Sequence, residues 1–149
     1  MSALRIVVRG LPAPQGSKRF LGTRGGRGIL VESSAKVKPW REDVRHAAIA
    51  AMQAAGIAEP ADAPLRLRVT FTLPKPASAP KRRTTWPMRT PDLSKLVRST
   101  EDALTSAGVW ADDARVVECT AAKRYPGEGA DALPWPGAVI EIEPLEDAR

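Results

Sequence analysis

The segment from Pro91 to Val117 constrains the fold most strongly, because its pattern predicts a helix, a turn and a strand in succession. Gly108 suits a left-handed helix terminator, and Val116 and Val117 begin the strand. Between Asp92 and Gly108, residues at spacings of three and four form one inward-facing helix face: Leu93, Leu96, Val97, Thr100, Ala103, Leu104 and Ala107. This segment therefore predicts a helix that packs on the core and a chain that turns back beside it.

The other helix faces are polar. Residues three or four apart share a helix surface, so two rows form: Asp92, Lys95, Ser99 and Asp102, then Ser94, Arg98, Glu101 and Thr105. Asp112 and Asp113 follow the turn. Acids at the helix start and at the returning turn could meet in space, and such a cluster suits a hard cation such as Mg²⁺.

A local explanation of these acids is also open. Asp92 could cap the helix, and Asp112 and Asp113 could form the turn, each acting on nearby backbone alone. Spacing by itself favours this local explanation, because caps and turns are commoner than metal sites.

The rest of the chain predicts one α+β domain over residues 1–149. Alternating or β-rich stretches predict strands, and a second apolar face beginning at Pro39 predicts another helix. The strands are expected at residues 4–8, 28–31, 65–73, 116–124 and 138–143, and the helices at 39–55 and 93–107. The element order is then β-β-α-β-α-β-β, and the acids of residues 138–143 predict an edge strand.

Charge favours a polyanionic partner. The 149 residues carry 23 Lys and Arg against 17 Asp and Glu, a net charge of +6. Two basic loops, near residues 15–28 and 74–90, are predicted to be mobile and to contact DNA, although solvated loops remain an alternative. Their candidate DNA-binding residues are Lys18, Arg19, Arg24 and Arg27 in the first loop and Lys81, Arg82, Arg83, Trp86 and Arg89 in the second.

A single cysteine, Cys119, excludes an internal disulfide and a cysteine-rich zinc site, and its strand context predicts a core position. His46 is interpreted as a surface histidine. No apolar run approaches the length of a membrane span, so a cytoplasmic protein is expected.

The order of residues in the central segment resembles a known family. Pro-Asp-x-x-x-Leu, Asp-Ala-Leu-Thr and Ala-Gly-Val-Trp-x-Asp-Asp-Ala-x-Val-Val, at this separation, closely resemble the signature of RusA-family Holliday junction resolvases. The resemblance covers about 27 continuous residues by this motif logic. It implies catalytic and metal-binding roles for Asp92 and Asp113, and weaker roles for Asp112 and Asp102.

Two positions depart from the family pattern. Ser94 stands where the family usually has a second motif acid, and Arg98 stands where its catalytic lysine is expected. A hydroxyl is a poorer ligand than a carboxylate, and Glu101 is the best candidate to compensate. Arg98 keeps its charge but cannot transfer a proton; a phosphate clamp and a surface ion pair with Glu101 are both open interpretations.

The resemblance implies a Mg²⁺-dependent endodeoxyribonuclease, with Mn²⁺ as a substitute, that resolves four-way DNA junctions by paired nicking as a homodimer. Arg98 or Lys95 would neutralise the phosphate, and Lys123 and Arg124 are expected to bind DNA near the acidic turn or just across the sheet. A role in DNA recombination and repair follows, and a phage origin fits the family. The alternatives are a branched-DNA binding protein with a weakened nuclease site and a basic module of another class, such as a ribonucleoprotein component.

Overall fold

The computed structural model describes residues 2–16, 18–24, 27–32 and 35–146, with the backbone alone for residues 18–24 and 27–32. Its elements are β1 (Leu4–Arg9), β2 (Lys18–Arg24), β3 (Arg27–Glu32), α1 (Val37–Ala54), β4 (Leu65–Thr72), α2 (Leu93–Ala107), the short 3-10 helix η1 (Asp113–Arg115), β5 (Val116–Arg124) and β6 (Gly137–Pro144). The predicted α+β class is confirmed. The helices begin and end within about two residues of their predicted bounds.

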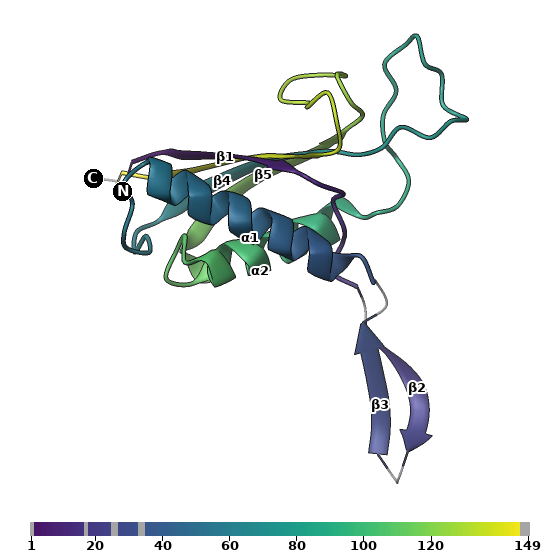
Figure 1. The fold of residues 1–149 in the computed structure, drawn as a ribbon, viewed down its shortest axis with the longest axis horizontal. Helices are drawn as coiled ribbons and strands as arrows, with labels where there is room; N and C mark the ends of the chain where they lie inside the picture. Colours follow the sequence, from purple (N-terminus) through teal and green to yellow (C-terminus); the bar gives the residue numbers. More distant parts are fainter. Residues whose placement is uncertain (1, 17, 25–26, 33–34, 147–149) are drawn as a thin grey trace.

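Four strands form the central sheet, in the order β1-β6-β4-β5. β6 runs antiparallel to β1 and to β4, whereas β4 and β5 are parallel. Both helices cover one face of this sheet (Figure 1). The prediction of an edge strand at residues 138–143 is wrong, because β6 lies between two neighbours. Its run of buried residues, Ala138 to Ile140, is the pattern of a central strand.

The strands β2 and β3 form a separate hairpin. Figure 1 shows this hairpin projecting from the body beside the N-terminal end of α1. Residues 18–24 were expected to be loop, and the backbone there is a strand instead. The side chains of Lys18, Arg19, Arg24 and Arg27 lie outside the described residues, so their DNA contacts stay predictions.

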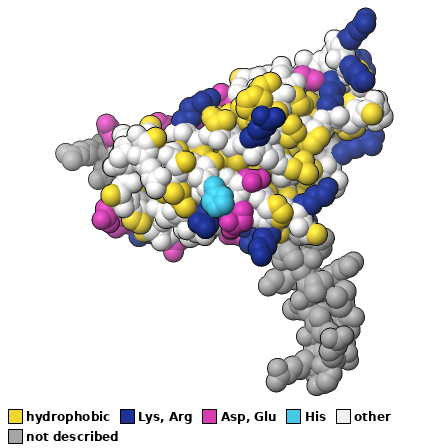
Figure 2. Space-filling model, viewed as in Figure 1, with side chains coloured by type: hydrophobic (Ala, Val, Ile, Leu, Met, Phe, Trp, Pro, Cys, Tyr) yellow, Lys and Arg dark blue, Asp and Glu magenta, His cyan; other side chains and the backbone are white. Residues whose placement is uncertain are grey.

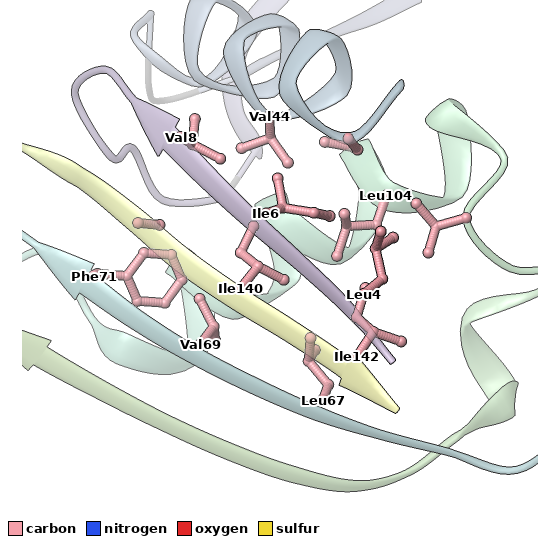
Figure 3. Packing of buried hydrophobic residues seen from close by; sticks show 14 of the residues in the cluster. Leu4, Ile6, Val8, Val44, Leu67, Val69, Phe71, Leu104, Ile140 and Ile142 are labelled. Atoms are coloured by element: carbon pink, nitrogen blue, oxygen red, sulfur yellow. The ribbon is translucent and has the colours of Figure 1, made fainter. Parts of the chain in front are cut away.

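The core lies between the helices and the sheet. Alternate residues of β1 and β6 meet Val44 of α1 and Leu104 of α2 there (Figure 3). The Trp40 indole N–H donates a hydrogen bond of 3.2 Å to Thr100 Oγ1, which itself donates to the Leu96 carbonyl. These bonds satisfy polar groups in a site that water cannot reach.

The segment after β1 is fixed to the first turns of α2. The Ser99 hydroxyl donates to the Ala13 carbonyl over 2.7 Å, and the Gln15 backbone N–H donates to the Lys95 carbonyl over 2.9 Å. Ser99, expected on an outward polar row, is therefore fully buried.

Among the described residues, no helix has both the length and the apolar character that are needed to cross a bilayer.

Candidate functional site

Asp92 lies at the N-terminal end of α2, where its backbone is extended. It occupies the N-cap position, but its side chain makes no capping hydrogen bond, so the local explanation does not account for this acid. Its carboxylate lies 3.6 Å from Lys95 Nζ in an exposed ion pair, a contact of small energy. The Asp92 carboxylate therefore faces solvent and remains available to a ligand.

Lys123 places this helix end beside the end of β5. Its ammonium donates hydrogen bonds to the carbonyls of Arg89 and Pro91, over 2.8 and 2.9 Å. Lys123 was expected to lie near the acidic turn or just across the sheet and to bind DNA. The structure places it at the start of α2, where it holds the backbone that leads into the helix, and DNA binding stays a prediction.

Asp112 and Asp113 lie at the opposite end of β5, in the turn before that strand. Asp112 Oδ1 accepts a hydrogen bond of 2.7 Å from the Ala114 N–H, and this bond, followed by one with Asp113, lowers the pKa of Asp112. The same carboxyl–carboxyl hydrogen bond is the main cause that raises the pKa of Asp113. Asp112 is thus the turn former that the local explanation predicted, and Asp113 is the acid left to take a proton or a cation.

Glu101 faces this second group of acids from α2. Its side chain is about half-buried, and loss of hydration raises its pKa first, followed by the charges of Asp113 and Asp102. The charge of Arg98 opposes the rise. Glu101 therefore extends the acidic turn and does not join Ser94 at the helix start.

Two groups of candidate ligands result, and one chain does not bring them together. The helix rise separates Asp92 from Glu101 by about 14 Å, and the strand rise separates Val116 from Lys123 by about 23 Å. Within the described part of the chain, no three His, Cys, Asp or Glu side chains converge to hold a metal ion. Among the described residues of one subunit, these acids thus do not form a complete cation site.

The loop between β4 and α2, residues 74–90, lies at the same end of the molecule as the hairpin and the start of α2 (Figure 1). Glu128 binds residues on both sides of this loop. Glu128 Oε2 lies 2.6 Å from Lys75 Nζ in a mostly buried ion pair, and Glu128 Oε1 accepts from the Thr85 N–H. These bonds, with Lys75 as the main partner, lower the pKa of Glu128. A single carboxylate thus fixes both sides of the loop.

The predicted DNA contacts of this loop are exposed. The side chains of Lys81, Arg82, Arg83 and Arg89 face solvent, and Trp86 is 68% exposed, with the Arg124 guanidinium 5.2 Å from its ring centroid. Figure 2 shows Lys and Arg gathered toward this end of the visible face, with most Asp and Glu toward the other end. The end that carries Asp92 is therefore the basic end.

The predictions overlooked a second basic row. Lys38, Arg41 and Arg45 line a groove of about 580 Å³ between α1 and α2, together with Glu42 and Asp102. Their spacing of three and four places them on one helix face, and this periodicity is the signal that could have found them. Cys119, expected in the core, is exposed on β5 instead.

Residues 10–132 match the model of a protein family described as endodeoxyribonuclease RusA. A comparison with curated proteins gives no significant match.

Proposed function

The chain belongs to the RusA family of endodeoxyribonucleases, a membership that implies cleavage of Holliday junctions, and from this premise we propose that it nicks four-way DNA junctions as a metal-dependent homodimer. The observation that supports a dimer is the placement of Asp92 and Asp113 at opposite ends of β5. A two-fold partner is the simplest way to bring two such groups together.

The exposed edge of the sheet suits this partner. β5 pairs with β4 on one side, and among the described strands none pairs with its other side. Residues 117–120 are exposed, and Val117 keeps 59% of its surface open. An unpaired strand edge is a template for pairing with another chain.

Antiparallel pairing of β5 with its copy supplies the missing geometry. A two-fold axis near Cys119 would set Val116 of one subunit opposite residues near the end of β5 in the other. The acidic turn of one chain would then lie beside the start of α2 in its partner. Each dimer would contain two such sites, one for each strand that must be cut.

In each shared site, Asp92 from one subunit and Asp113 from the other would hold a Mg²⁺ or Mn²⁺ ion, with Ser94 beside the first acid and Glu101 beside the second. The ion would supply an activated water and stabilise charge on the leaving oxygen. Arg98 and Lys95, both on exposed positions of α2, would bind the phosphate. The basic loop and the hairpin would hold the DNA arms.

The test compares a synthetic four-way junction with plain duplex DNA, in Mg²⁺ and in Mn²⁺. Asp92→Asn and Asp113→Asn should each slow junction cleavage by at least about a hundredfold, since even supporting residues of metal sites cost ten- to a hundredfold. Junction affinity in EDTA should stay near that of the unmodified protein.

Asp131→Asn is the matched control. Asp131 is an exposed loop acid with a positive φ of 61°, a conformation that Asn also tolerates, so this variant should cleave normally. If both active-site variants cut as fast as the control, the proposal is wrong.

A second candidate function is binding of branched DNA by a weakened nuclease. Ser94 in place of an acid favours it, as does the absence of a complete ligand set within the described part of one chain. Junction binding without nicking at any metal tested would select this function.

A further inference from the structure

A cavity of about 480 Å³ opens at the basic end of the molecule. Its walls come from the chain after β1, from both sides of the loop between β4 and α2, and from the single residues Lys36 and Tyr125. The walls are rich in proline rings, and Leu11 and Tyr125 add apolar surface. Such a space is large enough for one small ligand and too small for a duplex.

The charge of the cavity suits an anion attached to an apolar ring. Lys36 and Arg89 line it, both with exposed side chains, and no Asp or Glu is among the described residues of its wall. Lysine and arginine bind phosphate, whereas proline and tyrosine rings bind the flat faces of bases.

The walls of the cavity are fixed to the candidate active site. Thr90 and Pro91 line it and directly precede Asp92 in the chain. Lys123 holds the carbonyls of Arg89 and Pro91. On the other side, the Ser99 hydroxyl holds Ala13. A ligand in the cavity would therefore lie beside the first proposed metal ligand.

We propose that this cavity binds one unstacked nucleotide of the junction, with its base between Leu11 and Tyr125 and its phosphate toward Lys36 and Arg89. This inference rests on the proposed function, since it takes branched DNA as the substrate. A branch point interrupts base stacking, so a nucleotide there leaves the helix at lower cost than one within a duplex. The cavity thereby selects which phosphodiester is presented to Asp92.

The test combines a change in the DNA with a change in the cavity. Junctions that each carry one abasic nucleotide next to the branch are bound in EDTA, and affinity is measured by fluorescence anisotropy. For the unmodified protein, one abasic position should weaken binding about tenfold, the scale of one base stacked on a protein ring. Leu11→Trp fills the cavity, so it should weaken binding of the intact junction about tenfold and abolish sensitivity to that abasic position.

Val7→Trp is the control, because Val7 on β1 has an exposure of 44% against 42% for Leu11 and does not line the cavity. It should behave as the unmodified protein does. Lys36→Ala leaves the cavity open and should weaken all junctions while lowering the salt slope of binding by about one. This variant tests the phosphate contact even if the tryptophan variant does not fold.

Each result decides between the proposals. The nucleotide site is overturned if Leu11→Trp keeps normal junction affinity and normal sensitivity to the abasic position. It is also overturned if the abasic position does not weaken binding by the unmodified protein. Either result leaves the nuclease proposal standing. A positive cavity result without cleavage in any metal supports the nucleotide site and rejects the nuclease. A protein that binds no junction overturns both.

Discussion

Neighbouring residues of the same type differ in role because their backbone environments differ. Asp112 accepts the Ala114 N–H and forms the turn, whereas Asp113 carries the raised pKa. Sequence alone could predict a turn with two acids, but it could not say which acid the turn would use. The hydrogen bond that decides this depends on the extended backbone of Asp112.

Ser94 offers a gain-of-function prediction. It lies exposed in the first turn of α2, close in sequence to Asp92, where a carboxylate would meet the positive end of the helix dipole. Ser94→Asp should raise Mg²⁺-dependent cleavage and stabilise the protein by about 0.3–1 kcal/mol. Cleavage rates over a Mg²⁺ titration and thermal unfolding measure the two effects.

Ser106→Asp is the matched control at the other end of the same helix, where a negative charge is unfavourable. It should not raise cleavage. An equal rise in both variants would contradict a ligand role for position 94.

Thr100 tests the buried hydrogen bonds of the core. Thr100→Val keeps the shape of the side chain but leaves the Trp40 N–H without its acceptor. Such a loss should lower the free energy of unfolding by about 1–3 kcal/mol. Chemical denaturation followed by circular dichroism measures it.

Thr105→Val is the comparison, since Thr105 Oγ1 accepts the Trp110 N–H over 2.8 Å from an exposed position. Trp110 is buried, but the bond is only part-buried, so water can replace the acceptor in part and the cost should be smaller than for Thr100→Val. Equal costs for the two variants would show that burial does not set the penalty.

At the scale of elements, hydrophobic periodicity correctly predicted the helices, because the same apolar residues pack in the core. The bounds of α2 match the prediction because Leu96, Ala103 and Leu104 bury one face and Gly108 ends the helix with a φ of 80°. The place of β6 in the sheet was missed, because Glu141 and Glu143 suggested an edge. These acids lie on the partly exposed side of a central strand, where Arg66 pairs with Glu143.

The sequence analysis missed the separation of the candidate ligands, although the length of the helix between them would have shown it. A helix spanning Leu93–Ala107 is about 22 Å long, so acids before and after it cannot share one ion within the chain. Residue spacing identified the acids, and the family resemblance ranked them. Neither indicated that one chain would leave the two groups of acids apart.

Glu128 gives a prediction for the long loop. Because Lys75 and the Thr85 N–H favour the charged carboxylate, the tie is present above the ordinary pKa of glutamate and is lost as pH falls through the lowered pKa. Glu128→Gln removes the ion pair at any pH, and it should speed trypsin cleavage after Lys81, Arg82 or Arg83 several-fold.

Glu42→Gln is the control, since Glu42 forms longer surface ion pairs on α1. It should leave the cleavage rate of the loop unchanged. A loop cut equally fast in all three proteins would show that Glu128 does not restrain it, while the predicted mobility of the loop would stand.

At the scale of the whole molecule, active sites shared between two subunits predict that two inactive variants can restore activity when mixed. Sites contained within one chain do not. Asp92→Asn and Asp113→Asn are each expected to be inactive alone. In a mixed dimer, one of the two shared sites would receive both intact acids, one from each chain, and the other neither. Mixing the two variants should therefore restore nicking, mainly of one strand, to about a quarter of the normal rate, because random exchange makes about half of all dimers mixed.

Sites contained within one chain would give no recovery, because every chain in the mixture lacks one acid. The control is a mixture of either variant with itself. Thr120→Pro, placed on the exposed strand β5, should abolish both dimerisation and the recovery, because proline disfavours pairing at a strand edge.

The distance between the basic end and the acidic turn would protect cellular DNA from unwanted cleavage. In the proposed dimer, a lone subunit would bind DNA with its loop and its hairpin but would lack a complete site to cut it. Dilution would then suppress cleavage. The cleavage rate would rise as the square of the protein concentration until nearly all subunits are dimeric. A single subunit bound to a chromosome would leave the DNA intact.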